Sequence, residues 1–398
     1  MTIQMLRRAL TACAVMIGTA APLAAQVTQP ELLQRQLPGW SFTPGVSIAG
    51  VFDSNVAVVA PADTPTQGDR LVVLNPSGEL SFFSARTDFR GVYQGNLRRY
   101  VEVDGLDGFD QHASVALRRR ATRRLTFFIR DSFAAVATTD EIQINGVPFS
   151  RTGLKLNDFS TGLEARLTKV TSLDVAYDHT RVAFDRKEEF LNGGNVNALR
   201  AALNRQISLR TGIGAEYAIR LANIDDGEHE ITFYEAGGTL RHQLGEHTNA
   251  VIGGGLAYLS DRTFDETKSG PYVRLALTHE AERATAGVSV GRSFVPSFGF
   301  GGSNQSDEIR AFLHMPVDRN RAYVQASAGW NRTEPLVGGG PTFDTYRART
   351  TVGYSALPWL RLESFIDFTR QDSGVGGRDF NRRRAGAQLV ISQPMRFR

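Results

Sequence analysis

Residues able to perform catalysis are few and scattered in this sequence. The histidines stand at positions 112, 179, 229, 242, 247, 279 and 314. None has a Ser, Asp or Glu at a spacing typical of a nucleophile or a metal site. A hydrolase would need such a constellation at one rim of the fold, and His229 with Asp226 is the only loop pair on offer. We therefore expect no catalytic residues.

Metal and cofactor chemistry is equally poorly supported. The run Asn223-Ile224-Asp225-Asp226-Gly227-Glu228-His229-Glu230 carries four carboxylates but lacks the alternating ligand spacing of a calcium loop. Gly-x-Gly stretches such as Gly212-Ile213-Gly214 have no helix after them to cradle a phosphate. The single cysteine, Cys13, falls in the expected signal peptide. The sequence predicts no metal and no cofactor.

Arginine is the chemically distinctive residue type. Lys occurs only at 155, 169, 187 and 268, so Arg supplies 41 of the 45 basic side chains. The planar guanidinium suits anionic and hydroxyl-rich ligands. A formal net charge of +4 over 398 residues is too balanced to indicate nucleic acid, so we expect no nucleic-acid partner.

The elements that position these side chains have a period of two. From Leu360 to Thr369, one face collects Leu360, Leu362, Ile366 and Phe368 while the other collects Arg361, Glu363, Asp367 and Thr369. Segments with the same alternation recur along the chain, and none shows a sustained helical period with caps. No stretch beyond the N-terminus has the roughly 18 consecutive apolar residues of a membrane helix.

Turn residues divide the chain into about 18 such segments, each long enough to cross a bilayer at a tilt. Short connections, as at 85–87 and 121–122, alternate with longer ones rich in Gly, Asp and Asn, as at 138–152. This alternation is typical of outer-membrane barrels, whose short turns face the periplasm. The predicted fold is all-β: a transmembrane antiparallel outer-membrane β-barrel of about 18 strands, with 16 as the alternative.

The N-terminus predicts export. Arg7 and Arg8 precede an apolar stretch that ends near Ala25, which indicates a cleaved secretory signal peptide over residues 1–25. Residues 26–38 are expected to form a periplasmic lead and residues 39–398 the barrel. The first strand, Gly39–Phe52, should pair with the last, Phe380–Gln393, to close the cylinder.

A barrel of this size encloses an aqueous lumen, and the wet face of each strand should line it. The predicted lining side chains are Arg130, Arg166, Arg220, Arg274, Arg310, Arg347, Arg349, Arg361, Glu363 and Asp367. Alternatively, these charges are only a solvated face on which Arg and carboxylates pair across strands. Asp140 and Glu141, in the connection 138–152, are candidates for a loop that folds inward and narrows the lumen; the alternative is an ordinary exposed loop.

The stretch from Phe42 to Val56 ends its strand in Asp53-Ser54-Asn55. A threonine-proline strand ending in an aspartate-x-asparagine turn resembles the β-barrel porin-2 group of outer-membrane proteins, and the barrel spacing is similar over nearly all of the mature chain. The resemblance implies a link to exopolysaccharide and capsule export, in which glycan is moved or anchored at the outer membrane. The chain departs from that group in ending on Arg398.

Together these patterns favour a non-enzymatic, porin-like outer-membrane barrel with a polar passage, linked to polysaccharide export or surface glycan assembly. The alternatives are a structural or adhesive barrel with a closed lumen and, behind it, an outer-membrane hydrolase. The expected partners are outer-membrane lipid and lipopolysaccharide, the barrel assembly machinery and exopolysaccharide export components.

Overall fold

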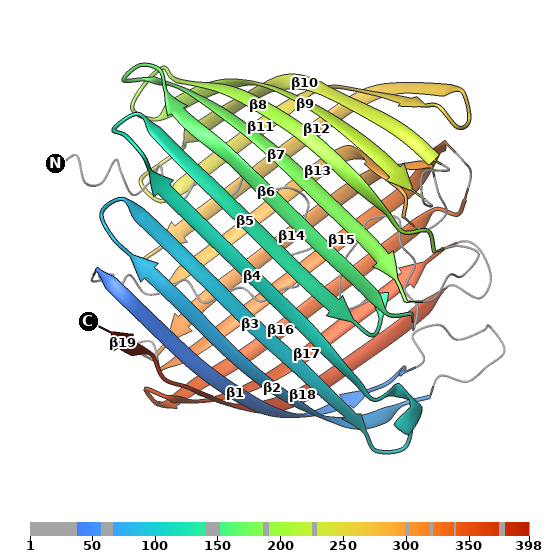
Figure 1. Ribbon diagram of the computed structural model, residues 1–398. Coiled ribbons are helices and arrows are strands. Elements are labelled where there is room, and N and C mark those ends of the chain that lie inside the picture. The colour runs from blue at the N-terminus through green and yellow to red at the C-terminus, as the bar shows by residue number, and fades with distance from the viewer. Residues whose placement is uncertain are drawn as a thin grey trace.

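The chain forms one closed antiparallel sheet (Figure 1). The computed structural model describes residues 38–56, 67–139, 152–185, 191–224, 229–298, 302–318, 321–337, 340–373 and 379–397. The expected signal peptide therefore lies outside the described residues. Within them, the one helical element is the 3-10 turn η1, Asp104–Leu106. No described helix has the length and apolar character needed to cross a bilayer.

Eighteen long strands follow one another around the barrel, and a three-residue strand, β19, completes the sheet. Their bounds are β1 Gly39–Asp53, β2 Asp69–Phe83, β3 Thr87–Tyr100, β4 Gly108–Arg120, β5 Leu125–Val136, β6 Leu154–Arg166, β7 Thr171–Phe184, β8 Gly194–Gln206, β9 Thr211–Ile224, β10 His229–Gln243, β11 Thr248–Asp261, β12 Glu266–Ala281, β13 Ala284–Pro296, β14 Ser303–Val317, β15 Ala322–Val337, β16 Phe343–Leu357, β17 Leu360–Asp372, β18 Phe380–Ser392 and β19 Met395–Phe397. The predicted barrel of 18 strands is confirmed, and the alternative of 16 is wrong.

The connections alternate in length as expected. The end of the barrel where β1 starts and β18 finishes, here called the turn end, carries short turns such as 84–86 and 282–283. The opposite, loop end carries longer connections such as those at 54–68 and 185–193. The β11–β12 connection, 262–265, is shorter than the sequence suggests because both strands extend into it.

Side chains alternate between an inward and an outward face. In β1, Ser47, Ala49 and Val51 are at most 8% exposed, whereas Val46 and Ile48 are 40% and 51% exposed. Residues paired across two strands lie on the same face of the sheet. The cross-strand registers therefore carry this assignment from β1 around all 18 long strands.

Part of the inward face is packed as a hydrophobic core. At the loop end of β5 to β12, inward residues such as Leu154, Ile231 and Leu259 are 0–1% exposed. A second inward cluster includes Val51, Leu71 and Tyr100 near the loop end of β1 to β3. The interior is therefore apolar toward the loop end, which the expectation of a charged lining did not include.

The connection over the second cluster is tied down by carboxylates. Asp69 accepts hydrogen bonds from the N–H groups of Glu102 and Val103, at 3.0 and 3.1 Å. Asp107 accepts one from the N–H of Tyr100, at 2.8 Å, and pairs with Arg99. The Tyr100 N–H, followed by the Arg99 guanidinium, lowers the pKa of the Asp107 carboxyl below its ordinary value. These contacts hold Val103 and Leu106 against the apolar cluster.

The first and last long strands close the barrel. β1 pairs with β18 from Gly45 opposite Ser392 to Asp53 opposite Arg384. Beyond a break at Pro394, which has no N–H to donate, β19 resumes the pairing with Trp40 opposite Phe397. The predicted seam between the first strand and the last is thus confirmed.

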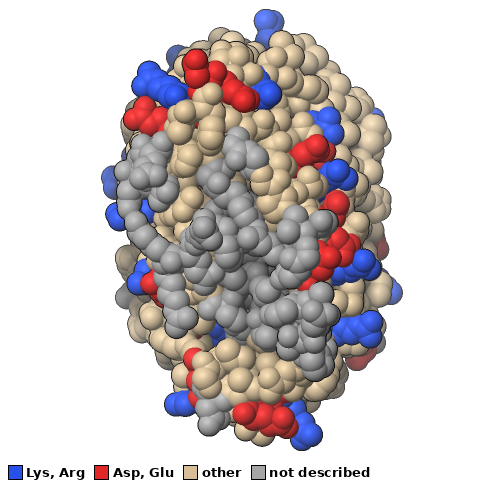
Figure 2. All heavy atoms as spheres, turned by 90° about the vertical axis from the view of Figure 1, so that its right-hand side faces the viewer, with Lys and Arg blue, Asp and Glu red and all other residues tan. Residues whose placement is uncertain are grey.

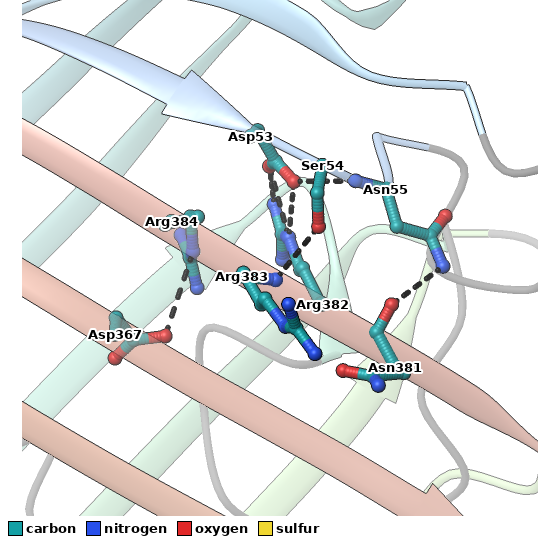
Figure 3. Close-up of polar contacts among 8 residues, drawn as sticks. All are labelled: Asp53, Ser54, Asn55, Asp367, Asn381, Arg382, Arg383 and Arg384. Carbon is teal, nitrogen blue, oxygen red and sulfur yellow. Dashed lines mark hydrogen bonds and ion pairs between the residues drawn. The ribbon is translucent and has the colours of Figure 1, made fainter.

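A buried ion pair locks the loop end of this seam (Figure 3). The Arg382 Nε donates to both carboxylate oxygens of Asp53, at 3.0 and 2.9 Å, and neither residue is more than 2% exposed. The turn Asp53-Ser54-Asn55 adds further links to β18: the Ser54 Oγ accepts from the Arg383 N–H, and the Asn55 Nδ2 donates to the Asn381 carbonyl. The aspartate-x-asparagine turn therefore joins two strands 329 residues apart in sequence.

Removing one partner of this pair leaves a buried charge uncompensated. We expect Asp53→Ala to lower the free energy of unfolding by about 3–5 kcal/mol. Urea titration of detergent-folded protein, followed by the fluorescence of its three tryptophans, measures the change. The matched control is Glu230→Ala, which breaks an exposed pair with Arg262 and should cost no more than about 1 kcal/mol. Equal losses in the two variants would contradict a locking role for Asp53.

Candidate functional site

The candidate site is the inward face of the barrel between its turn end and the apolar clusters. By register and alternation, all ten predicted lining residues lie on this face: Arg130, Arg166, Arg220, Arg274, Arg310, Arg347, Arg349, Arg361, Glu363 and Asp367. The structure therefore places them around one interior. Their part in solute passage stays a prediction.

Most charges of this face are paired with a neighbour. Arg310 donates to Glu308 at 2.7 Å, and Arg274 lies 3.7 Å from Glu216. Further inward pairs are Arg90 with Glu79, Arg118 with Glu164, Arg200 with Asp178, Arg220 with Glu235, Arg361 with Glu363 and Arg384 with Asp367. The cross-strand ladder that was the alternative reading of these side chains is thus present on much of the wall.

Two inward arginines differ from this ladder. Arg130 lies over the ring of Phe128 at 5.2 Å, and Arg349 lies over the ring of Phe365 at 4.9 Å. Neither forms an ion pair within 4.0 Å with another residue in the part of the chain that the structure describes. An aromatic face attracts a guanidinium without neutralising its charge. These two side chains therefore present positive charge to the interior.

Two tyrosines lie along the wall instead of pointing to its centre. Tyr272 crosses the glycine positions Gly237 and Gly255 and donates to Glu216 at 2.9 Å. Tyr323 crosses Gly353 in the same way and donates to Glu363. Each ring occupies the space where a Cβ would otherwise lie. The glycines of 253–255 were expected to mark either strand curvature or a close approach in the lumen, and Tyr272 makes that close approach.

A segment at the loop end of β13 folds into the barrel. The register of β13 with β12 stops at Arg292 opposite Val273, so the residues that follow leave the wall on that side. Phe294 and Phe298 are 2% and 5% exposed and join the apolar cluster of β5 to β12. The Phe298 carbonyl accepts from the Asn192 N–H, at 2.9 Å, just before β8. The segment therefore spans from β13 to the opposite part of the wall.

Arg220 anchors this inward segment. Its Nη2 donates to the Phe294 carbonyl at 2.9 Å, and the same guanidinium pairs with Glu235 and lies 5.2 Å from the Phe233 ring. Arg220 thus stands where the charged wall meets the apolar cluster. Its side chain is the inward charge that holds part of a connection inside the barrel.

The inward segment was missed from the sequence. The candidates for a constriction, Asp140 and Glu141, lie outside the described residues. The available signal was the apolar content of Phe294-Val295-Pro296-Ser297-Phe298 at a strand end followed by a connection, where the other long connections are polar. Aromatic side chains at such a place indicate burial against another part of the fold.

Neither metal binding nor catalysis gains support from the geometry. Within the described ranges, no group of three or more His, Cys, Asp or Glu side chains is arranged to hold a metal ion. His229 stacks on Phe264 with ring centroids 5.5 Å apart. Its proposed partner Asp226 and most of the 223–230 carboxylates lie outside the described residues.

The fold and its inward face define a closed antiparallel barrel with an apolar exterior. No protein-family model and no curated protein matches the sequence. Similar solved structures include the outer membrane protein OpdK of Pseudomonas aeruginosa, with 10% identity and a TM-score of 0.45 over 89% of this chain and 99% of that chain. OccAB4 of Acinetobacter baumannii has 10% identity and a TM-score of 0.45 over 91% of this chain and 100% of that chain. At this distance, no solute or partner follows for the present chain.

The close fit of Tyr272 makes a test of the glycine positions. A Cβ on Gly255 would lie 2.8 Å from the Tyr272 ring, so Gly255→Val should displace the ring and lower the free energy of unfolding by about 1–3 kcal/mol. Gly50→Val is the control, because a Cβ there meets nothing within 4 Å. Urea midpoints in detergent compare the two, and an unchanged midpoint for Gly255→Val would contradict the packing.

Proposed function

We propose that the chain is a non-enzymatic, porin-like channel of the outer membrane that gives polar solutes a passage across the bilayer. The observation that carries this proposal is the division of one closed sheet into an apolar outward face and a charged inward face. In hydrocarbon every backbone N–H and C=O must pair within the protein, and a closed barrel meets this condition. Charged side chains then face an interior that water can fill.

The outward face supports membrane insertion. Near the turn end, Trp40 packs against Phe82 and Phe89, with ring centroids 4.9 and 5.8 Å away, as in an interfacial aromatic girdle. Near the loop end, the outward residues Arg292, Asp307, Arg332 and Asp344 lie opposite one another on four successive strands. Figure 2 shows acidic and basic side chains around this rim. The apolar band thus ends in polar residues there.

The orientation follows from the connections. Short turns face the periplasm and long loops face outside in barrels of this kind. A signal peptide over residues 1–25 would deliver the chain to the assembly machinery, and outer-membrane lipid with lipopolysaccharide would surround it. The finer proposal, a role in polysaccharide export or surface glycan assembly together with export components, rests on the resemblance carried by Asp53-Ser54-Asn55.

A structural or adhesive barrel with a closed lumen is the second candidate. It is favoured by the apolar packing at the loop end, where Phe294 and Phe298 cover inward side chains of the opposite wall. Planar-bilayer recordings of the purified protein separate the two functions. Stable single-channel conductance is expected for the channel, and its absence across all applied voltages would support the closed barrel.

The inward segment should limit conductance. We expect Arg220→Ala to raise the single-channel conductance, because it removes the donor that holds the Phe294 carbonyl inside the barrel. The control is Arg241→Ala, another inward arginine, which donates to Asn204 on the wall itself. The same conductance in Arg220→Ala and in the unaltered protein would contradict a restricting role for the segment.

The arginines without carboxylate partners should set ion preference. Replacing Arg130 and Arg349 together by Ala is expected to shift the reversal potential in a KCl gradient toward cations, since their charge is not neutralised within the wall. Lys155→Ala is the control, because this outward side chain pairs with Asp185 outside the barrel. A reversal potential that stays constant in the double variant would show that these guanidinium groups do not face the conducting path.

A further inference from the structure

Three neighbouring turns at the turn end carry exposed apolar side chains. They connect β6 to β7, β8 to β9 and β10 to β11. Their exposed apolar residues are Leu167, Val170, Ile207, Leu209 and Leu244, of which Leu209 is 82% exposed. Such a contiguous apolar surface is unusual for protein facing water and indicates an interaction surface.

Other turns at the same end are polar. The β2–β3 turn contains Ser84 and Arg86, the β4–β5 turn contains Arg123 and Arg124, and the β12–β13 turn consists of Glu282 and Arg283. The apolar surface is therefore confined to one sector of the rim. A sequence preference common to all short turns does not explain it.

The apolar turns continue the outward face of their strands. Leu167, Ile207 and Leu244 each follow the last outward position of β6, β8 and β10 by two residues, in the period-two alternation. Just inside them, Leu203 lies opposite Leu173, and Leu240 lies opposite both Ile213 and Ile252. The turns thus extend an unbroken apolar surface without a polar boundary.

At the loop end of the same sector, the outward face becomes polar early. Asp131, the fifth residue before the end of β5, accepts from the Asn157 Nδ2 at 2.9 Å. On β7 and β8, Tyr177 and His179 both hydrogen-bond the Asn197 side chain. By contrast, outward apolar residues on β1 and β2 run almost to the loop end. Charged groups on the lipid face are costly at the centre of a bilayer and much less so at its surface.

We propose that the three apolar turns are inserted into the lipid leaflet at the turn end, so that on β6 to β11 the apolar band is displaced toward that leaflet. This proposal rests on the proposed membrane function. The occupant is lipid, because the surface is continuous with the lipid-facing wall and shifts in step with the polar boundary at the other end. Lys169, Arg205 and Arg210 beside the leucines add charge complementary to anionic headgroups.

Site-specific fluorescence in nanodiscs tests this placement. The only cysteine is Cys13, in the expected signal peptide, so a mature chain starting near Gln26 accepts a single engineered cysteine. Leu209→Cys, labelled with an environment-sensitive dye, should be quenched by brominated lipid and protected from aqueous iodide. Arg123→Cys, in the polar β4–β5 turn, should show the reverse. Nanodiscs leave both faces of the bilayer open to iodide.

Ile48→Cys, on the outward face of β1, reports insertion itself. Lipid quenching at both Ile48 and Leu209 supports the proposal. Lipid quenching at Ile48 with iodide quenching at Leu209 would overturn it while leaving the membrane function intact, and would assign the turns to a periplasmic protein instead. Iodide quenching at Ile48 would overturn both. Leu244→Cys repeats the measurement in a second turn, so that a local distortion at Leu209 does not decide the result.

Discussion

Closure of the hydrogen-bonded sheet is the constraint on which the rest of this structure depends. A flat sheet has two edges with unpaired N–H and C=O groups, and neither edge is tolerable in hydrocarbon. Here the edges are β1 and β18, which meet along nine residue pairs between Gly45 and Asp53 and their partners. The buried contact of Asp53 with Arg382 fixes the register at the loop end, while β19 extends pairing at the turn end. Each inward or outward side chain takes its position from that register.

The interior combines two environments that are usually separate. Toward the turn end, arginines and carboxylates pair across strands as on a hydrated surface. Toward the loop end, Leu154, Ile231 and Leu259 pack with Phe294 and Phe298 as in the core of a soluble domain. Arg220 joins the two, since its guanidinium contacts a carboxylate, an aromatic ring and a carbonyl of the inward segment. The border of the wet interior is therefore set by particular side chains and not by the sheet alone.

The sequence was sufficient for the sheet and insufficient for its contents. The alternation from Leu360 to Thr369 predicted which side chains share a face, because each strand has a period of two whatever its neighbours are. Connection lengths predicted the order of strands for the same local reason. By contrast, the contacts of Phe294 with Arg220 and of Phe298 with Asn192 join residues far apart in sequence. No pattern within one strand reports such contacts, nor does it show that Arg310 is paired while Arg349 lies on a ring.

The dominance of arginine has a consequence for the medium in which such a barrel works. The guanidinium remains protonated throughout the range in which lysine, histidine and carboxyl groups titrate. Positive charge held by Arg130 and Arg349 is consequently the same in an acidified soil or gut as at neutrality. The interior thus carries a permanent electrostatic bias, and acidification can alter it only through the acids that share the wall.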